Sequence, residues 1–266
     1  MPDRHVDMTL LGGLTANRAR GLADLVADVT GSRLAGPPFL APVLLYSDPS
    51  VQSQLDLPLP QGDAILVQEF QGVEYPAAFP LNTDLDAAAT VRPQDDIVEL
   101  RFSLSAAQAA VAHLSTVLRR VPVTDLGAVK ATPFRTESLG DSVRWSAPFT
   151  VSQHQTDRYL TLSGDRNPIH RDPAEARRLG LTAPIVPGLL LVSLIQPICE
   201  ASVPGGWLVS LKSRFLAPLC MLAPLRIGVQ LRGGALDQVQ KARAYLIDMD
   251  DRALAIVDLQ VRTTPD

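Results

Sequence analysis

An apolar stretch at residues 188–201 constrains the fold of this chain more than any other part of the sequence. A helix that is hydrophobic on all sides is either buried or spans a membrane, and this stretch is too short to span. We therefore expect a central helix that the rest of the chain surrounds. Pro197 should kink or end its regular part, because proline lacks a backbone donor. The aliphatic residues of the stretch are Leu189, Leu190, Leu191, Val192, Leu194, Ile195 and Ile198.

Short apolar runs separated by Gly, Pro or Asp predict strands in both halves of the chain. Residues 97–104 alternate between apolar and polar side chains, which gives a strand one dry face and one wet face. Residues 106–113 are also compatible with a short helix. An antiparallel sheet curved around one buried helix is the hot-dog fold. The expected strands are 64–75, 83–91, 97–104 and 111–121, and then 207–215, 225–232, 239–248 and 254–262.

The order of elements occurs twice, which points to a duplicated architecture. Thr15 and Gly31 bracket one helical pattern, and Ser152 with Gln155 forms a capping-box pattern that opens another. A chain of 266 residues can bury two cores of ~130 residues each. We predict an α+β, double hot-dog fold. Its expected parts are an N-terminal unit at residues 1–125, a linker at 126–142 and a C-terminal unit at 143–266.

Composition excludes several classes of partner. The net charge of −4, without a Lys/Arg cluster, argues against nucleic-acid binding. Asp3 and Asp7 interrupt the basic region that a signal peptide would need, and no run is long enough to span a membrane. Cys199 and Cys220 lie in apolar surroundings and should be buried free thiols. A cytoplasmic location is therefore expected.

Residues 163–170, Ser-Gly-Asp-Arg-Asn-Pro-Ile-His, bring acid–base groups and turn formers together. Gly164 gives backbone freedom just before Asp165, and Pro168 restricts the residue before it to extended geometry. An aspartate and His170 that converge on one water can carry general acid–base chemistry, typically worth ~10²–10⁴-fold in rate. Five extended residues can also span ~17 Å, so the spacing permits proximity without fixing it.

The start of the central helix, at Gly188, supplies a second kind of group. Backbone N–H groups at a helix N-terminus lack partners within the helix and carry partial positive charge. Such a donor can stabilise the enolate oxygen of a thioester, and losing an oxyanion donor typically costs ~10²–10³-fold in rate.

Residues 159–170 closely resemble the signature of the MaoC-like, R-specific enoyl-thioester hydratases and dehydratases, and residues 171–188 continue the match. The resemblance implies a hot-dog fold. It also implies that Asp165 and His170 activate the water that adds to the β-carbon, and that Gly188 donates its N–H to the thioester carbonyl. Asn167 matches a motif asparagine that is expected to hold the catalytic groups in place without contacting the substrate. No cofactor and no metal is implied.

Two departures from the family pattern bear on the substrate. Many relatives have His where this chain has Pro187, so acyl selectivity should differ. The N-terminal half has no copy of the Gly-Asp-x-Asn-Pro-x-His loop. The resemblance to double hot-dog members implies a catalytically silent half that makes room for bulkier acyl chains.

Three functions are compatible with this pattern. The first is reversible hydration of trans-2-enoyl thioesters to (R)-3-hydroxyacyl thioesters, with acyl-CoA or acyl carrier protein as partner. The second is a carrier-protein-dependent dehydratase of fatty acid or polyketide assembly, and the third is a non-catalytic acyl-thioester-binding subunit. A monomer and a homodimer both fit the sequence. A basic patch at the pocket mouth would favour phosphorylated carriers, and its candidates are Arg166, Arg171, Arg177 and Arg178.

Other kinds of site find little support. His170 and Asp172 lack a third metal ligand at a suitable spacing. Ser163 does not stand in the Gly-x-Ser-x-Gly pattern of a nucleophile elbow. Acid–base chemistry at residues 163–170 is therefore the leading hypothesis.

Overall fold

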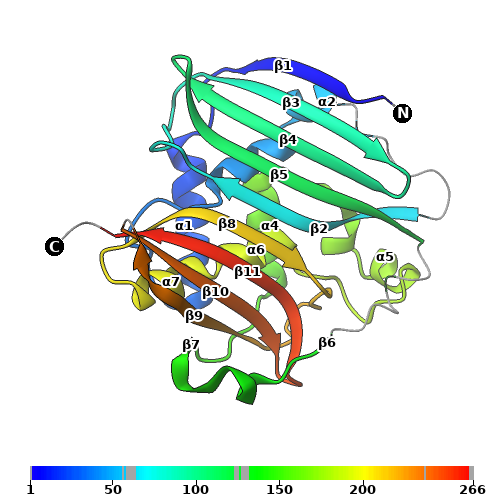
Figure 1. Ribbon diagram of the computed structural model, residues 1–266. Coiled ribbons are helices and arrows are strands. Elements are labelled where there is room, and N and C mark those ends of the chain that lie inside the picture. The colour runs from blue at the N-terminus through cyan, green and yellow to red at the C-terminus, as the bar shows by residue number, and fades with distance from the viewer. Residues whose placement is uncertain are drawn as a thin grey trace.

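The computed structural model describes residues 2–55, 57, 64–122, 126, 132–236 and 238–263. Within them an antiparallel sheet of 11 strands runs in the order β1-β3-β4-β5-β2-β8-β11-β10-β9-β7, and β6 pairs with β11 (Figure 1). The strands are β1 (Arg4–Leu10), β2 (Ala64–Glu74), β3 (Leu85–Gln94), β4 (Ile97–Ala106), β5 (Ala109–Pro122), β6 (Thr132–Pro133), β7 (Val143–Trp145), β8 (Trp207–Phe215), β9 (Leu225–Leu236), β10 (Val239–Asp248) and β11 (Arg252–Arg262).

The main helices pack against one face of this sheet, and Figure 1 shows α1, α4, α6 and α7 behind it. Among the described residues no helix has the length and apolar character needed to cross a bilayer. The helices are α1 (Ala16–Thr30), η1 (Ala41–Ser47), α2 (Pro49–Leu55), η2 (Thr136–Ser142), α4 (Gln153–Ser163), η3 (Pro168–His170), α5 (Pro173–Arg178), α6 (Gly188–Ser193) and α7 (Gln196–Ser202).

The predicted central helix consists of two short helices, α6 and α7, with a break at Leu194 and Ile195. Pro197 lies in the first turn of α7, where its missing N–H costs nothing. Its ring would clash with the carbonyl of Ser193, four residues earlier, in a continuous helix. Leu194 and Ile195 remain fully buried at the break, so the segment is central, as predicted, and its regular part is interrupted, as Pro197 indicated.

The sequence prediction missed one strand of the sheet and left one segment undecided between strand and helix. The prediction missed β1, where Met8 and Leu10 are buried and alternate with exposed Asp7 and Thr9. This is the same alternation that predicted the strand at residues 97–104, and β1 pairs with β3 along its whole length. Residues 106–113 contain no helix, because a turn at residues 107–108 joins β4 directly to β5.

Strands β2 and β8 join two groups of strands, β1 to β5 and β7 to β11, into one sheet. Gln71 on β2 faces Ser213 on β8 in the pairing register, and both side chains are fully buried. The Ser213 hydroxyl donates to the Gln71 carbonyl at 3.3 Å, and the Thr116 hydroxyl donates to the Gln71 side-chain oxygen at 2.7 Å. The division into residues 1–125, 126–142 and 143–266 stays a prediction, and residues 127–131 of that linker lie outside the described residues.

Candidate active site

Helix α4 leads the chain into the predicted catalytic loop. Ser152 caps its start, and the backbone and side chain of Gln155 complete the predicted capping box. The helix ends where Gly164 takes a left-handed conformation, with φ 76° and ψ 10°, and donates its N–H to the Leu160 carbonyl at 2.9 Å. Glycine suits this position because other residues pay a steric penalty there. The chain therefore turns sharply just before Asp165.

Hydrogen bonds on both sides fix Asp165. Its N–H donates to the Ser163 hydroxyl at 3.2 Å, and its Oδ1 accepts the N–H of Asn167 at 2.9 Å. The Asn167 side chain in turn accepts the N–H of Ile169 at 3.3 Å and caps η3. One carboxylate oxygen is thus held by the loop, and the other, Oδ2, is directed toward His170.

The His170 ring has a defined tautomer. Its Nδ1 lies 2.9 Å from the carbonyl oxygen of Ile185, which can only accept, so Nδ1 carries the hydrogen of the neutral ring. Its Nε2 is then an acceptor, 3.7 Å from Oδ2 of Asp165. The side chains of His170 and Asp165 are 11% and 30% exposed, so the imidazole is nearly buried and the carboxyl group is partly open to solvent.

Burial sets the charge of the groups around Asp165. Desolvation lowers the pKa of His170 and outweighs Asp165 and the Ile185 carbonyl, which raise it, while Arg171 lowers it further. Burial also raises the pKa of Tyr159, and the charge of Asp165 adds to that rise. Near neutral pH the imidazole of His170 and the phenol of Tyr159 are therefore neutral. A single water can donate one hydrogen to Nε2 and the other to Oδ2 across this gap.

The loop packs against a strand of the N-terminal half. Ile169, between the acid–base residues, is 3% exposed, and Ile65 and Val67 of β2 pack on its cluster. The other buried members are Leu126, Ala176, Leu179 and Leu181. Residues of both halves of the chain thus pack against the loop between Asp165 and His170.

Gly188 is the first residue of α6, directly after Pro187. A Cβ at Gly188 would lie 2.8 Å from the Phe215 ring of β8, so only glycine lets the helix start this close to the sheet. The preceding residues are tied to the loop, because Ile185 donates its N–H to the Ile169 carbonyl at 3.2 Å. The same Ile185 holds His170 through its carbonyl, which places the helix start three residues along the chain from that contact.

The structure brings Asp165 and His170 together and joins Gly188 to them through residues 185–188. Sequence reasoning missed Ile185, whose role belongs to its backbone carbonyl and leaves no trace in residue type. It also missed Phe215, which a strand pattern marks only as an inward-facing apolar residue. Asn167 was singled out, and it caps η3 while its N–H holds Asp165.

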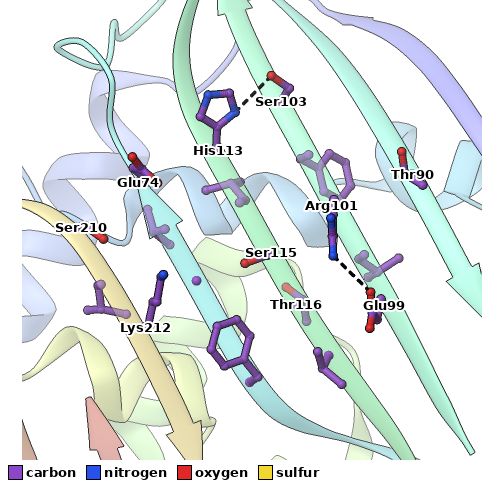
Figure 2. A pocket seen from close by; sticks show the side chains of 18 of the residues that line it. Glu74, Thr90, Glu99, Arg101, Ser103, His113, Ser115, Thr116, Ser210 and Lys212 are labelled. Atoms are coloured by element: carbon purple, nitrogen blue, oxygen red, sulfur yellow. Dashed lines mark hydrogen bonds and ion pairs between the residues drawn. The ribbon is translucent and has the colours of Figure 1, made fainter. Parts of the chain in front are cut away.

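A depression of about 610 Å³ lies elsewhere, on the outer face of the sheet (Figure 2). Its floor and walls come from β2, β3, β4, β5 and β8, and include His113, which lies 3.2 Å from the Ser103 hydroxyl. Its acidic and basic side chains are mixed, so it does not select ions of one charge. Within the described part of the chain, no three His, Cys, Asp or Glu side chains are grouped as metal ligands.

The C-terminal part of the chain is similar to known proteins. Residues 135–245 match the MaoC like domain family. A mitochondrial 3-hydroxyacyl-[acyl-carrier-protein] dehydratase of Arabidopsis thaliana is 35% identical over 81 residues, which are 30% of this chain and 48% of that protein. An (R)-specific enoyl-CoA hydratase of Aeromonas caviae is 36% identical over 67 residues, 25% of this chain and 48% of that protein. The chain thus spans about half the length of these curated relatives.

A solved structure confirms the fold over the whole chain. A conserved hypothetical protein from Mycobacterium tuberculosis with a double hot-dog fold superimposes with a TM-score of 0.62 and 16% identity. The match covers 98% of this chain and 96% of that chain. The predicted double hot-dog fold is therefore correct.

Proposed function

From the match of residues 135–245 to the MaoC like domain family and from the double hot-dog fold, we propose that the protein is a hydro-lyase of acyl thioesters. It reversibly interconverts trans-2-enoyl and (R)-3-hydroxyacyl groups. The proposal rests on one observation, the unprotonated Nε2 of His170 facing Oδ2 of Asp165 across 3.7 Å. The two acceptors hold one water between them.

The reaction adds this water across the double bond. As the water oxygen bonds to the β-carbon, the Asp165–His170 pair takes one of its protons. The π electrons move onto the thioester oxygen and form an enolate. The pair then returns a proton to the α-carbon, and the reverse sequence eliminates water. The thioester itself acidifies the α-position, so no cofactor takes part.

The enolate oxygen requires a donor, and the Gly188 N–H at the start of α6 supplies it in this proposal. A backbone donor at a helix start is oriented before the substrate arrives, so it needs no reorganisation as charge develops. The close approach of Gly188 to Phe215 supports this role, because it keeps the first turn of α6 in one position. Pro187 gives this turn a fixed φ and adds no polar side chain of its own.

The thioester carrier is either CoA or an acyl carrier protein. Exposed Arg166, Arg171 and Arg177 lie on or next to the catalytic loop and favour a phosphorylated carrier of either kind. The names of the relatives support both, since one is a carrier-protein dehydratase and the other an enoyl-CoA hydratase. The carrier is therefore decided by assay.

The test is a panel of trans-2-enoyl groups of increasing length, each offered on CoA and on a phosphopantetheinylated carrier protein. We expect hydration of at least one member, with the (R)-3-hydroxyacyl product identified by chiral chromatography. Asp165→Asn should lower the rate by about 10²–10⁴-fold, because it removes one of the two acceptors. Its melting temperature should stay close to that of the wild type.

Asp7→Asn is the matched control, since Asp7 is an exposed carboxylate on β1, the strand at one end of the sheet. It should leave the rate unchanged. Near wild-type activity in Asp165→Asn would refute the acid–base assignment. Failure of the wild type with every thioester would favour a non-catalytic acyl-binding protein.

A further inference from the structure

A side chain of the N-terminal half reaches α4, the helix that leads into the proposed site. Arg18 of α1 donates from Nε to the carbonyl of Leu162 at 3.1 Å, in the last turn of α4. Its Nη2 donates to the carbonyl of Leu44, in η1, at 2.8 Å. Its Nη1 lies 3.7 Å from Oδ2 of Asp48. One guanidinium thus joins α1, η1 and the C-terminal end of α4.

Arg18 places a positive charge and hydrogen-bond donors at the C-terminal end of α4. The last four carbonyls of a helix have no partner within it, and a cation there also interacts favourably with the helix dipole. Helix α4 has no basic residue of its own in its last turn. The guanidinium of Arg18, with a side chain only 25% exposed, supplies that charge from another element.

Helices α1 and α4 also pack closely at the same point. A Cβ on Gly21 of α1 would lie 2.6 Å from a terminal carbon of the Leu162 side chain. The Leu162 residue is therefore held on two sides, its carbonyl by Arg18 and its side chain by the backbone of α1. Asp165 follows Leu162 by only three residues, through the turn at Gly164.

We propose that Arg18 is a positioning residue for the hydration site: by fixing the end of α4 it sets where Asp165 stands relative to His170. This inference rests on the proposed function for its kinetic consequence. Arg18 does not touch the acid–base pair in this arrangement, and it acts through Leu162 and the turn that follows. The N-terminal half then contributes to catalysis through support of the other half.

The kinetic test compares Arg18→Gln with Arg20→Gln. Arg20 is exposed and two residues further along α1, so its variant removes the same charge from the same helix without touching α4. Arg18→Gln should lower kcat by about 10- to 100-fold with little change in KM, because a small misplacement of a reacting group carries a cost of that order. Arg20→Gln should change neither constant.

Arg18→Lys provides the conservative variant and also a fallback if Arg18→Gln does not fold. Lysine keeps the charge but cannot reproduce the fork that binds two carbonyls. We expect a kcat between those of the wild type and Arg18→Gln. Equal kcat values for the wild type and both Arg18 variants would overturn the proposal, as would equal losses in Arg18→Gln and Arg20→Gln.

A second readout does not depend on turnover: the pKa of His170, followed through its ring resonances by NMR and assigned with His170→Gln. Asp165 and the Ile185 carbonyl raise this pKa, while burial and Arg171 lower it. If Asp165 moves away from His170 in Arg18→Gln, the pKa of His170 falls. If Arg18 acted only through its charge, the pKa would rise instead.

The two proposals can therefore fail separately. If the wild type turned over no thioester, the proposed function would fail, and the NMR titration would still decide the role of Arg18. A fall in the His170 pKa in Arg18→Gln alone would support positioning. An unchanged or raised pKa would overturn it.

Discussion

The first helix of each half ends in the same kind of turn. In the N-terminal half, α1 ends at Thr30, and Gly31 adopts φ 69° and ψ 10° and donates to the Ala27 carbonyl at 2.9 Å. The next residue, Ser32, donates its N–H to the Thr30 hydroxyl at 3.3 Å. A hydroxyl residue, a left-handed glycine and a third residue bonded back to the hydroxyl thus form a compact turn.

The C-terminal half repeats this turn with other side chains. Helix α4 ends at Ser163, and Gly164 adopts φ 76° and ψ 10° and donates to the Leu160 carbonyl at 2.9 Å. Asp165 donates its N–H to the Ser163 hydroxyl at 3.2 Å. Asp165 therefore stands where the other half has Ser32.

The comparison separates the scaffold from its chemistry. Both halves have the same backbone turn, so the turn serves the fold. The C-terminal half differs in having a carboxylate, that of Asp165, at the third residue of the turn. The chain then continues to Pro168 and His170 in the C-terminal half, whereas Gly36 and Pro37 follow in the N-terminal half without an imidazole. The proposed site is an addition to a turn that both halves use.

Exchanging the distinguishing residue should have the largest effect. Asp165→Ser makes the two turns alike and should lower the hydration rate by about 10²–10⁴-fold, because it removes an acid–base group. Ser32→Asp gives both turns an aspartate and should leave the rate unchanged, because no imidazole follows residue 32 as His170 follows Asp165. Steady-state rates with the best substrate of the panel measure both. Residual activity of Asp165→Ser near that of the wild type would mean that the shared turn does not carry the chemistry.

The second-largest effect should follow from a side chain at Gly188. Alanine there meets the Phe215 ring at 2.8 Å, so the first turn of α6 must shift and its N–H with it. We expect kcat to fall by about 10²–10³-fold, the usual cost of an oxyanion donor. Phe215→Leu should restore part of the loss in the double variant, since it makes room for the methyl group. A double variant as slow as Gly188→Ala would argue against the steric cause.

Local signals in the sequence predicted the ends of these helices well. Thr15 and Gly31 bracket α1, and Ser152 opens α4, as their residue types indicated. Such signals work because a cap bonds to atoms only a few residues away. The strand β1 escaped prediction although its residues alternate as those of 97–104 do, and its pairing with β3 identifies it in the structure.

The site itself could be predicted only in part. The sequence pointed to Asp165 and His170, but their distance depends on how η3 folds and on the Ile185 carbonyl that orients the ring. Arg18 lies 144 residues before the carbonyl that it binds, and no pattern along the chain connects the two. Contacts of this kind arise from tertiary packing and become visible only in three dimensions.

A smaller effect should come from the glycines of the two turns. Alanine in the left-handed region costs roughly 1–2 kcal/mol, so Gly31→Ala and Gly164→Ala should each lower the free energy of unfolding by about this amount. A Cβ at Gly31 would meet nothing within 4 Å, so that variant isolates the backbone cost. Only Gly164→Ala should also lower kcat, because only that turn positions Asp165. Urea unfolding and steady-state kinetics on the same preparations give both quantities, and a loss of kcat in Gly31→Ala would contradict the separation.

The smallest effect should be a contribution to acid stability from His170, in the loop of residues 163–170. Burial lowers the pKa of His170 below its ordinary value in the folded state, whereas the unfolded chain keeps a value of about 6.5. The unfolded state therefore binds the proton first as pH falls, and stability decreases as protons are taken up. The contribution of the neutral His170 to the free energy of unfolding is complete above about pH 6.5. It is lost as pH falls through the pKa that His170 has in the folded state.

Free energies of unfolding at about pH 7.5 and about pH 5.5 should differ less in His170→Gln than in the wild type. His113→Gln removes an exposed imidazole from the other half and should retain the wild-type difference. If His170→Gln lost as much stability in acid as the wild type, the burial of His170 would not set the acid response of this fold.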